Sequence, residues 1–261
     1  MAYDVTACPV CAGTLATYFA TVEAPDVRPG DAIPAQRVWM RCPTCTHLYT
    51  AQAWPSGSLG PDEYWNSMLR YREPPVSGND TAWDYARFAD IWDRVRILIK
   101  KKTPSDATSL IELDCGKCYF AGAAKDLGLD VTAAADYTKF RPFAIGVGAD
   151  WVKASVEELN VDPHDIVVFN NLLERLPDPK TALTNAPLST GGVVYVSTPL
   201  SDSAWTKMTG WIGANHLADE MHFFSTQSLT TLITAAGFRK IDARMSTTYC
   251  GCTEWILERI P

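Results

Sequence analysis

Four cysteines near the N-terminus have the residue type and the spacing of a metal site. Cys8 and Cys11 form one CxxC pair, and Cys42 and Cys45 form a second pair. Each pair can present two thiolates to one tetrahedral zinc ion, so the two pairs together fill its coordination sphere. Because no position is left for water, the expected zinc supports folding and shape rather than chemistry. We therefore predict a structural zinc ribbon.

Other uses of these cysteines stay open at this point. They could form two disulfides or remain free thiols, and His47 could replace one of them as a zinc ligand. A disulfide inside a CxxC pair is strained unless it serves redox exchange. Residues 1–7 are too short and too polar for a secretory signal, so the eight cysteines favour a reducing, cytoplasmic compartment.

The composition indicates a folded protein without membrane spans and argues against a general nucleic-acid-binding protein. The chain has 261 residues, of which 47% are hydrophobic, which is enough for one substantial core and a small appendage. No stretch approaches the roughly twenty apolar residues of a membrane span. The formal net charge of -7 argues against broad nucleic-acid binding, which relies on Lys and Arg.

The first predicted region, residues 1–50, is the zinc ribbon. Alternating apolar and polar residues predict strands at 37–41 and 48–50, beside the second cysteine pair. Three prolines and a Pro-Gly-Asp turn predict a loop at 24–35.

The second predicted region, residues 51–107, is a connector and a docking helix. Its first part is rich in proline, glycine and aromatic residues, and we expect it to dock through Tyr64 and Trp65. Apolar residues recur at helical spacing over 81–102, and Pro104 closes the run.

The third predicted region, residues 108–261, alternates short apolar runs with helical stretches. This alternation predicts an α/β fold, with a mostly parallel sheet that is covered on both faces. The predicted strands are residues 110–113, 131–135, 166–170 and 193–197, and an antiparallel hairpin of 238–243 and 254–260 closes the sheet.

A tight turn and an acidic residue follow two of these strands. The first strand runs into Glu112-Leu113-Asp114-Cys115-Gly116-Lys117-Cys118, and the second ends near Asp136. Neighbouring carboxyl ends of a parallel sheet are where nucleoside ligands bind.

These residues resemble the first motif, E/D-x-G-x-G-x-G, of class I S-adenosylmethionine-dependent methyltransferases. Three later segments strengthen the resemblance: residues 170–179, NNLLERLPDP; residues 191–199, GGVVYVSTP; and residues 222–238, which begin HFFS and end AGF. The resemblance spans residues 108–261 and implies a Rossmann-like methyltransferase sheet. A cysteine ribbon before such a domain is similar to the arrangement in zinc-containing sugar and natural-product methyltransferases.

The chain departs from the family pattern at several positions. Asp114 and Cys118 stand where the first and third glycines are expected, and Gly116 keeps the second. Glycine is favoured there because the turn needs left-handed dihedrals and close backbone approach. Arg175 replaces the histidine that follows Leu-Glu in the family, and Asp136 falls one residue later than the usual ribose-binding acid.

The resemblance implies roles for particular residues. Asp136, or Glu112 through the loop, would bind the ribose hydroxyls, and residues 170–172 would line the methionine end. The full set expected to bind S-adenosylmethionine is Glu112, Asp114, Cys115, Gly116, Tyr119, Asp136, Asn170, Asn171 and Leu172. His222, Glu174 and Tyr64 are candidate catalytic residues, each with a packing or structural role as the alternative.

The other cysteines also come in pairs, Cys115 with Cys118 and Cys250 with Cys252. Both pairs are expected at the ligand edge of the sheet, where they could form a second metal or redox site. Two strands are expected to lie between the pairs, which favours ordinary buried thiols instead.

Three functions follow from these patterns. The first is methyl transfer to a small natural-product or sugar-like molecule. The second is an inactive pseudo-methyltransferase that serves as a scaffold and binds a partner protein. The third, RNA base methylation, is disfavoured by the acidic composition. The sequence sets neither the methyl acceptor nor the oligomeric state.

Overall fold

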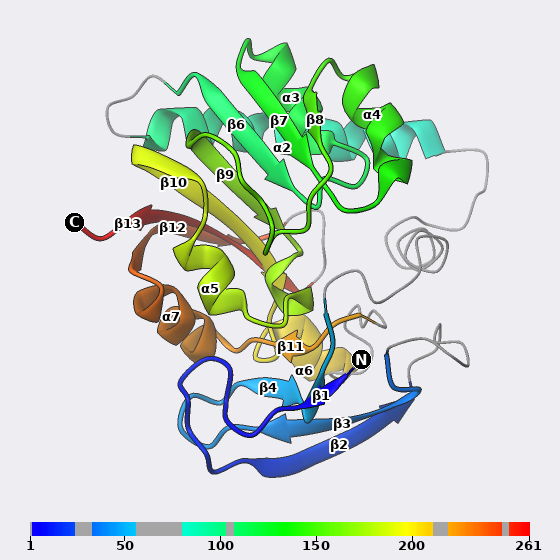
Figure 1. Cartoon of the computed structure of the whole chain (residues 1–261), viewed down its shortest axis with the longest axis vertical. Coiled ribbons are helices and arrows are strands. Elements are labelled where there is room, and N and C mark those ends of the chain that lie inside the picture. Colours follow the sequence, from blue (N-terminus) through cyan, green and yellow to red (C-terminus); the bar gives the residue numbers. More distant parts are fainter. Residues whose placement is uncertain (1, 24–32, 56–79, 103–106, 211–218, 247–250) are drawn as a thin grey trace.

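The computed structural model describes residues 2–23, 33–55, 80–102, 107–210, 219–246 and 251–261 (Figure 1). Most of the predicted loop at 24–35, as well as Tyr64, Trp65 and Cys250, lies outside these described residues. No described helix is both long enough and apolar enough to cross a membrane.

A seven-stranded sheet forms the centre of the molecule, in the order β12-β13-β10-β9-β6-β7-β8. Its strands are β6 (Ser109–Leu113), β7 (Asp130–Ala134), β8 (Asp150–Val152), β9 (His164–Asn170), β10 (Leu188–Pro199), β12 (Phe238–Met245) and β13 (Cys252–Arg259). Strands β6 to β10 pair in parallel, and β13 pairs antiparallel with both β10 and β12. The predicted α/β class with a closing antiparallel hairpin is confirmed.

The direction in which the strands are added reverses between β6 and β9. From β6 the chain adds β7 and β8 on one side, and it then crosses back to add β9 and β10 on the other side. Such a switch point leaves a crevice at the carboxyl ends of the two strands, where open α/β sheets bind their ligands.

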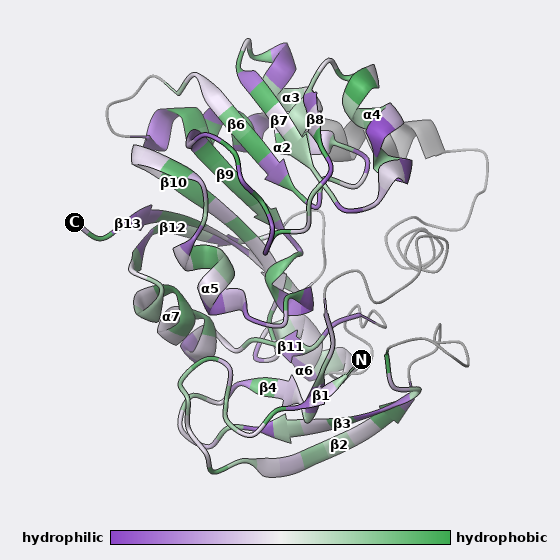
Figure 2. Cartoon of the chain, in the orientation of Figure 1, coloured by the Kyte–Doolittle hydropathy of each residue, from purple (hydrophilic) through white to green (hydrophobic). Residues whose placement is uncertain are grey.

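Helices cover both faces of the sheet (Figure 1). On one face lie α2 (Asp80–Lys101), α3 (Tyr119–Asp126) and α4 (Arg141–Gly146), and on the other lie α5 (Pro179–Thr184) and α7 (Thr226–Ala235). Neighbouring residues in a strand point to opposite faces, so Leu110 joins the first core and Ile111 the second. The strands β6, β9 and β10 are largely hydrophobic in Figure 2, as expected for a sheet that is buried on both faces.

The N-terminal region forms two small sheets. One has the order β11-β4-β3-β2, with β2 at Thr17–Glu23, β3 at Gln36–Arg41, β4 at Leu48–Thr50 and β11 at His222–Phe223. The other pairs β1 (Tyr3–Asp4) with β5 (Gln52–Ala53). Strand β11 comes from the third predicted region, so the ribbon sheet takes one strand from the far end of the chain.

In the part of the chain that the structure describes, three short helical elements remain. A 3-10 turn η1 (Thr138–Phe140) follows β7, and a second 3-10 turn η2 (Leu173–Arg175) follows β9. Helix α6 (Ala204–Thr209) follows β10 and begins after Ser203, whose hydroxyl caps the amide of Thr206.

Candidate functional site

The four N-terminal cysteines meet in one cluster. Their sulfur atoms all lie within 4.8 Å of one another. The Cys8 and Cys45 sulfurs are 3.6 Å apart, and the Cys11 and Cys42 sulfurs are 3.5 Å apart. A tetrahedral zinc with Zn–S bonds of about 2.3 Å places its ligands about 3.8 Å apart, so this cluster fits the ion.

The two cysteine pairs have the same backbone conformation. The amide of Ala12 donates to the carbonyl of Cys8, and the amide of Thr46 donates to the carbonyl of Cys42. Ala12 and Thr46 both adopt left-handed dihedrals, with φ of 58° and 62°. This repeated turn aims both thiols of each pair at the same point.

Burial changes the acidity of these thiols. It raises the pKa of Cys8 to about 11. Burial also acts on Cys42, but hydrogen bonds from the backbone of Cys45 and from the thiol of Cys11 outweigh it and lower the pKa of Cys42 to about 7. Zinc binds thiolates, so zinc binding must displace the thiol protons. The affinity of the cluster for zinc therefore decreases as the pH is lowered.

His47 and His222 form a buried pair beside this cluster. The Nε2 of His222 lies 2.8 Å from the carbonyl of Leu176, and since a carbonyl only accepts, this nitrogen carries the proton. The Nδ1 of His222 therefore accepts from the Nε2 of His47, at 3.2 Å. Burial lowers the pKa of His222 to about 4, and it lowers the pKa of His47 as well.

This placement engages both ring nitrogens of His222. The side chain ties β11 to the ribbon and to the turn after β9, which favours the structural role over that of a general base. His47 is hydrogen-bonded to His222 and does not belong to the four-sulfur cluster.

The loop after β6 keeps the shape of a glycine motif. Asp114, Gly116 and Cys118 have φ of 48°, 49° and 59°, so all three motif positions are left-handed. Only one of them is a glycine, and aspartate tolerates this region better than most residues. The loop thus keeps the turn and adds two side chains to it.

Asp114 and Arg175 form an ion pair between two strand ends. The Arg175 guanidinium contacts the Asp114 carboxylate, and it lies 3.4 Å from a carboxylate oxygen of Asp219. Its Nε also donates to the carbonyl of Asn171, at 2.9 Å. The side chains of Arg175 and Asp114 are only 5% and 15% exposed. Two departures from the family pattern are therefore partners of each other.

Glu112 lies beneath this loop. Its buried carboxylate accepts from the amide of Ala121 at 2.9 Å, which fixes the first turn of α3 to β6. Cys115 is also buried, and its amide donates to the carbonyl of Ala134, linking the loop to β7. Tyr119 begins α3 and is partly buried against the first core.

Asp136 and Tyr137 follow β7 at the same edge of the sheet. Asp136 is exposed at this edge. Burial raises the pKa of the Tyr137 phenol, and the nearby carboxylates of Asp114 and Asp219 raise it further. The ends of β6, β7 and β9 thus bring their side chains to one place.

The segment after β9 also reaches this edge. Asn170 ends the strand, and Asn171 has a left-handed φ of 49°. The Asn171 side chain accepts from the hydroxyl of Ser197 at 3.0 Å. Leu172 is buried in the second core. Glu174 is 1% exposed and accepts from the hydroxyl of Thr198 at 2.9 Å, so its placement favours a structural role.

The other described cysteines are Cys115, Cys118 and Cys252. Cys115 and Cys118 follow β6, whereas Cys252 begins β13. Strands β9 and β10 lie between β6 and β13, as the sequence predicted. Among the described residues, these thiols belong to no metal-binding cluster.

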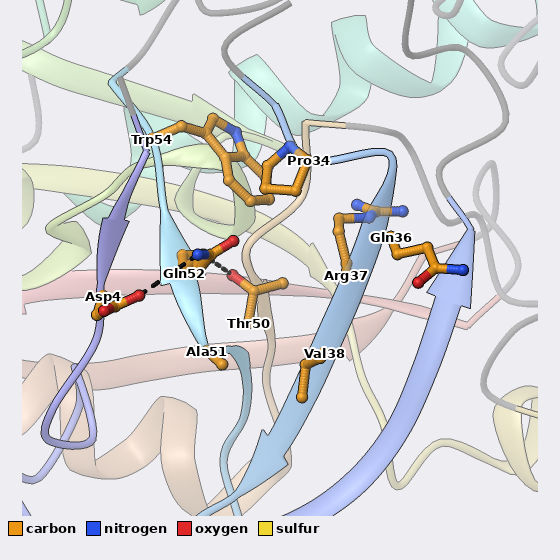
Figure 3. A pocket seen from close by; sticks show the side chains of 9 residues that line it. All are labelled: Asp4, Pro34, Gln36, Arg37, Val38, Thr50, Ala51, Gln52 and Trp54. Atoms are coloured by element: carbon orange, nitrogen blue, oxygen red, sulfur yellow. Dashed lines mark hydrogen bonds between the residues drawn. The ribbon is translucent and has the colours of Figure 1, made fainter. Parts of the chain in front are cut away.

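A groove of about 280 Å³ opens between the ribbon strand β3 and the segment from β4 to β5 (Figure 3). Polar side chains line it together with the indole ring of Trp54. One of them, Arg37, is 1% exposed and donates to the carbonyl of Glu220 at 3.1 Å. No sequence pattern indicates this groove, because its lining residues come together only in the folded sheets.

Sequence comparison identifies the family. The profile of the methyltransferase domain family matches residues 83–243. The chain therefore belongs to this family, and its fold is that of the class I S-adenosylmethionine-dependent methyltransferases, as the resemblance implied. No curated protein sequence matches the chain significantly.

Solved structures share the fold. The chain is similar to 1,6-didemethyltoxoflavin-N1-methyltransferase from Burkholderia thailandensis, solved with 1,6-didemethyltoxoflavin and S-adenosylhomocysteine. Their TM-score is 0.54 at 20% identity, over 92% of this chain and 100% of that chain. Magnesium protoporphyrin IX methyltransferase from Synechocystis PCC 6803, solved with S-adenosylhomocysteine, gives a TM-score of 0.56 at 11% identity, over 75% of this chain and 94% of that one. At such identities the similarity establishes the fold alone.

Proposed function

We propose that this protein transfers a methyl group from S-adenosylmethionine to a small natural-product or sugar-like molecule. The observation that carries this proposal is the left-handed backbone at 114, 116 and 118, at the carboxyl end of β6 and beside the switch point. Left-handed conformations at non-glycine residues cluster at ligand-binding sites, so their presence at 114 and 118 supports a ligand-binding loop.

The placement of the proposed binding residues supports a role for each of them. Asp136 would accept hydrogen bonds from the ribose hydroxyls, while Glu112 would hold the loop from below. Residues 114–116 and Tyr119 would contact the cofactor from the loop side, and residues 170–172 would line its methionine end. The cofactor would supply an activated methyl group, and the protein's task would be alignment for in-line transfer.

The ribbon would have a structural part in this function. Its four cysteines, Cys8, Cys11, Cys42 and Cys45, would hold one zinc. We propose three regions: the zinc ribbon at residues 1–50, the connector and docking helix at 51–107, and the methyltransferase domain at 108–261. We place the reaction in the cytoplasm, where eight cysteines would stay reduced.

The groove on the ribbon is our candidate for part of the acceptor site. Arg37 lines it and donates to the carbonyl of Glu220. The preceding residue, Asp219, lies 3.4 Å from Arg175, which follows β9 at the switch point. The groove and the crevice therefore adjoin the same short segment, and a volume of about 280 Å³ suits part of a small molecule. The names of the two similar solved structures also refer to small molecules, 1,6-didemethyltoxoflavin and magnesium protoporphyrin IX.

No base is assigned among the described residues. His222 and Glu174 are buried in hydrogen bonds, and Tyr64 lies outside the described residues. A base is needed only where the acceptor must lose a proton, so alignment alone suits an acceptor that is already a good nucleophile.

A scaffold function is the second candidate, and one observation favours it. The Asp114 side chain reaches across the strand ends to Arg175, where a glycine would leave the crevice open. In that case the sheet would persist without the cofactor, and the ribbon would serve a partner protein.

Calorimetric titration of zinc-loaded protein with S-adenosylmethionine and S-adenosylhomocysteine separates the two candidates. Micromolar binding of either ligand supports the enzyme and justifies a screen of small-molecule acceptors. Absence of heat and of a thermal shift at millimolar ligand would overturn the proposal in favour of the scaffold.

A further inference from the structure

The groove on the ribbon contains a buried donor without an acceptor. The indole ring of Trp54 lines this groove and is 1% exposed (Figure 3). Within the described ranges of the chain, its N–H has no hydrogen-bond partner. A buried N–H in this state costs roughly 1–3 kcal/mol, and such groups are rare in native proteins. A bound group that accepts a hydrogen bond would satisfy this donor.

Arg37 brings positive charge to the same groove. Its buried guanidinium donates to the carbonyl of Glu220 at 3.1 Å and lies 6.0 Å from the ring centroid of Trp39. A carbonyl and an indole ring carry no net charge, and a guanidinium stays charged in proteins. Hydrogen bonds and ion pairs with an anionic oxygen are stronger than those with a neutral one, so the groove favours an acceptor that carries negative charge.

The one acidic residue of the lining lies apart from Arg37. Asp4 is exposed, and its carboxylate accepts from the side-chain amide of Gln52 at 3.4 Å. In Figure 3 Gln52 lies between Asp4 and Thr50, whereas Arg37 comes from β3 on the opposite wall. Because water and salt screen an exposed carboxylate, Asp4 would oppose an anion at Arg37 only weakly.

One short segment holds both donors in place. The backbone amide of Trp54 donates to the sulfur of Met221 at 3.4 Å, next to the Glu220 carbonyl that accepts from Arg37. Donors that are fixed before a ligand arrives lower the entropic cost of binding it. The apolar part of the lining would contact the body of a small molecule; it consists of Pro34, Val38 and Ala51.

We infer that the groove binds a carboxylate of the methyl acceptor, which is therefore a small carboxylic acid. The carboxylate would accept from the Trp54 N–H and face the Arg37 guanidinium. It would anchor the molecule rather than receive the methyl group, because Arg37 belongs to the ribbon strand β3 and the cofactor is proposed to bind at the ends of β6, β7 and β9. This inference rests on the proposed function, which it narrows from small molecules in general to carboxylic acids.

The test uses benzoate and benzamide, which share a ring and differ in the charge of one group. The indole N–H signals of isotope-labelled, zinc-loaded protein are followed by NMR spectroscopy during each titration, without cofactor. The chain has nine tryptophans, and Trp54→Phe identifies the signal of Trp54 by its loss. Trp205→Phe is the matched control, because Trp205 lies on α6 and does not line the groove.

We expect benzoate to move the Trp54 indole proton downfield, since the N–H gains an acceptor. Benzamide should bind about tenfold more weakly than benzoate, and Trp54→Phe should weaken benzoate about tenfold in ligand-detected NMR, against less than about twofold for Trp205→Phe. Unchanged signals of the other indoles show that Trp54→Phe is folded. No shift of the Trp54 signal, equal binding of benzamide, or unchanged benzoate affinity in folded Trp54→Phe would overturn the inference.

A parallel titration with S-adenosylhomocysteine separates this inference from the proposed function. Binding of S-adenosylhomocysteine without binding of benzoate overturns the inference alone. Binding of benzoate without binding of S-adenosylhomocysteine overturns the proposed function, and with it the assignment of the carboxylate to a methyl acceptor.

Discussion

Substitution of His222 tests whether this residue is structural or catalytic. His222 donates to the Leu176 carbonyl and accepts from His47, and all three groups are buried. In His222→Ala both hydrogen bonds are lost, and a carbonyl and an N–H remain buried without their partners. Each such group costs roughly 1–3 kcal/mol, and the lost ring adds a cavity, so we expect unfolding to be easier by about 3–5 kcal/mol.

Two further variants sharpen this expectation. Asparagine places an acceptor near the position of Nδ1, and glutamine places a donor near the position of Nε2. His222→Asn and His222→Gln should therefore each keep one of the two hydrogen bonds and cost about 1–3 kcal/mol, less than alanine.

The assay is chemical denaturation of zinc-loaded protein at pH 7, with zinc content measured for each variant. Cofactor binding should persist wherever the protein is folded, since His222 bonds to Leu176 and His47 rather than to the loop after β6. Unchanged unfolding free energy in all three variants, together with lost methyl transfer, would refute the structural role and restore His222 as a base.

Three other outcomes follow from the same structure. Metal analysis should give one zinc per chain for wild type and Cys115→Ser and a loss of zinc for Cys45→Ser; a second zinc that Cys115→Ser removes would contradict the single site. Asp136→Asn should weaken S-adenosylhomocysteine about tenfold in calorimetry, and unchanged affinity would remove Asp136 from the ribose site. Lys102, 2.7 Å away, and three hydrogen bonds hold the pKa of Asp165 well below its usual range despite burial. Asp165→Asn should thus cost about 2–3 kcal/mol at pH 7, a difference that shrinks below about pH 4 as the unfolded carboxylate is protonated; denaturation midpoints across pH would show this.

The central sheet could be predicted because its strands carry their own signal. Strands β6, β7, β9 and β10 are short apolar runs, and the final hairpin is long enough to show its pattern. Strand β8 has only three residues, Asp150–Val152, which is too short for any periodicity. Strand β2, Thr17–Glu23, lies at the edge of its sheet and is mostly exposed, so it lacks an apolar alternation.

The cysteine cluster could be predicted from the sequence, whereas the contacts of the loop after β6 could not. The cysteine spacing predicts the cluster, because the same turn brings two thiols together within each pair. Asp114 and Arg175 were each recognised as departures from the family pattern. Their pairing joins residues 61 positions apart, and it exists only because β6 and β9 are neighbours in the folded sheet.

Strand β11 shows why the ribbon and the methyltransferase fold form a single structure. A two-residue strand is not stable alone, so His222–Phe223 is extended only because β4 pairs with it. The same short segment supplies Asp219 to Arg175, the Glu220 carbonyl to the ribbon, and His222 to His47. A distortion of the ribbon would therefore reach Arg175 within a few residues. A zinc ion that takes no part in chemistry would still set the shape of the crevice in which the chemistry is proposed.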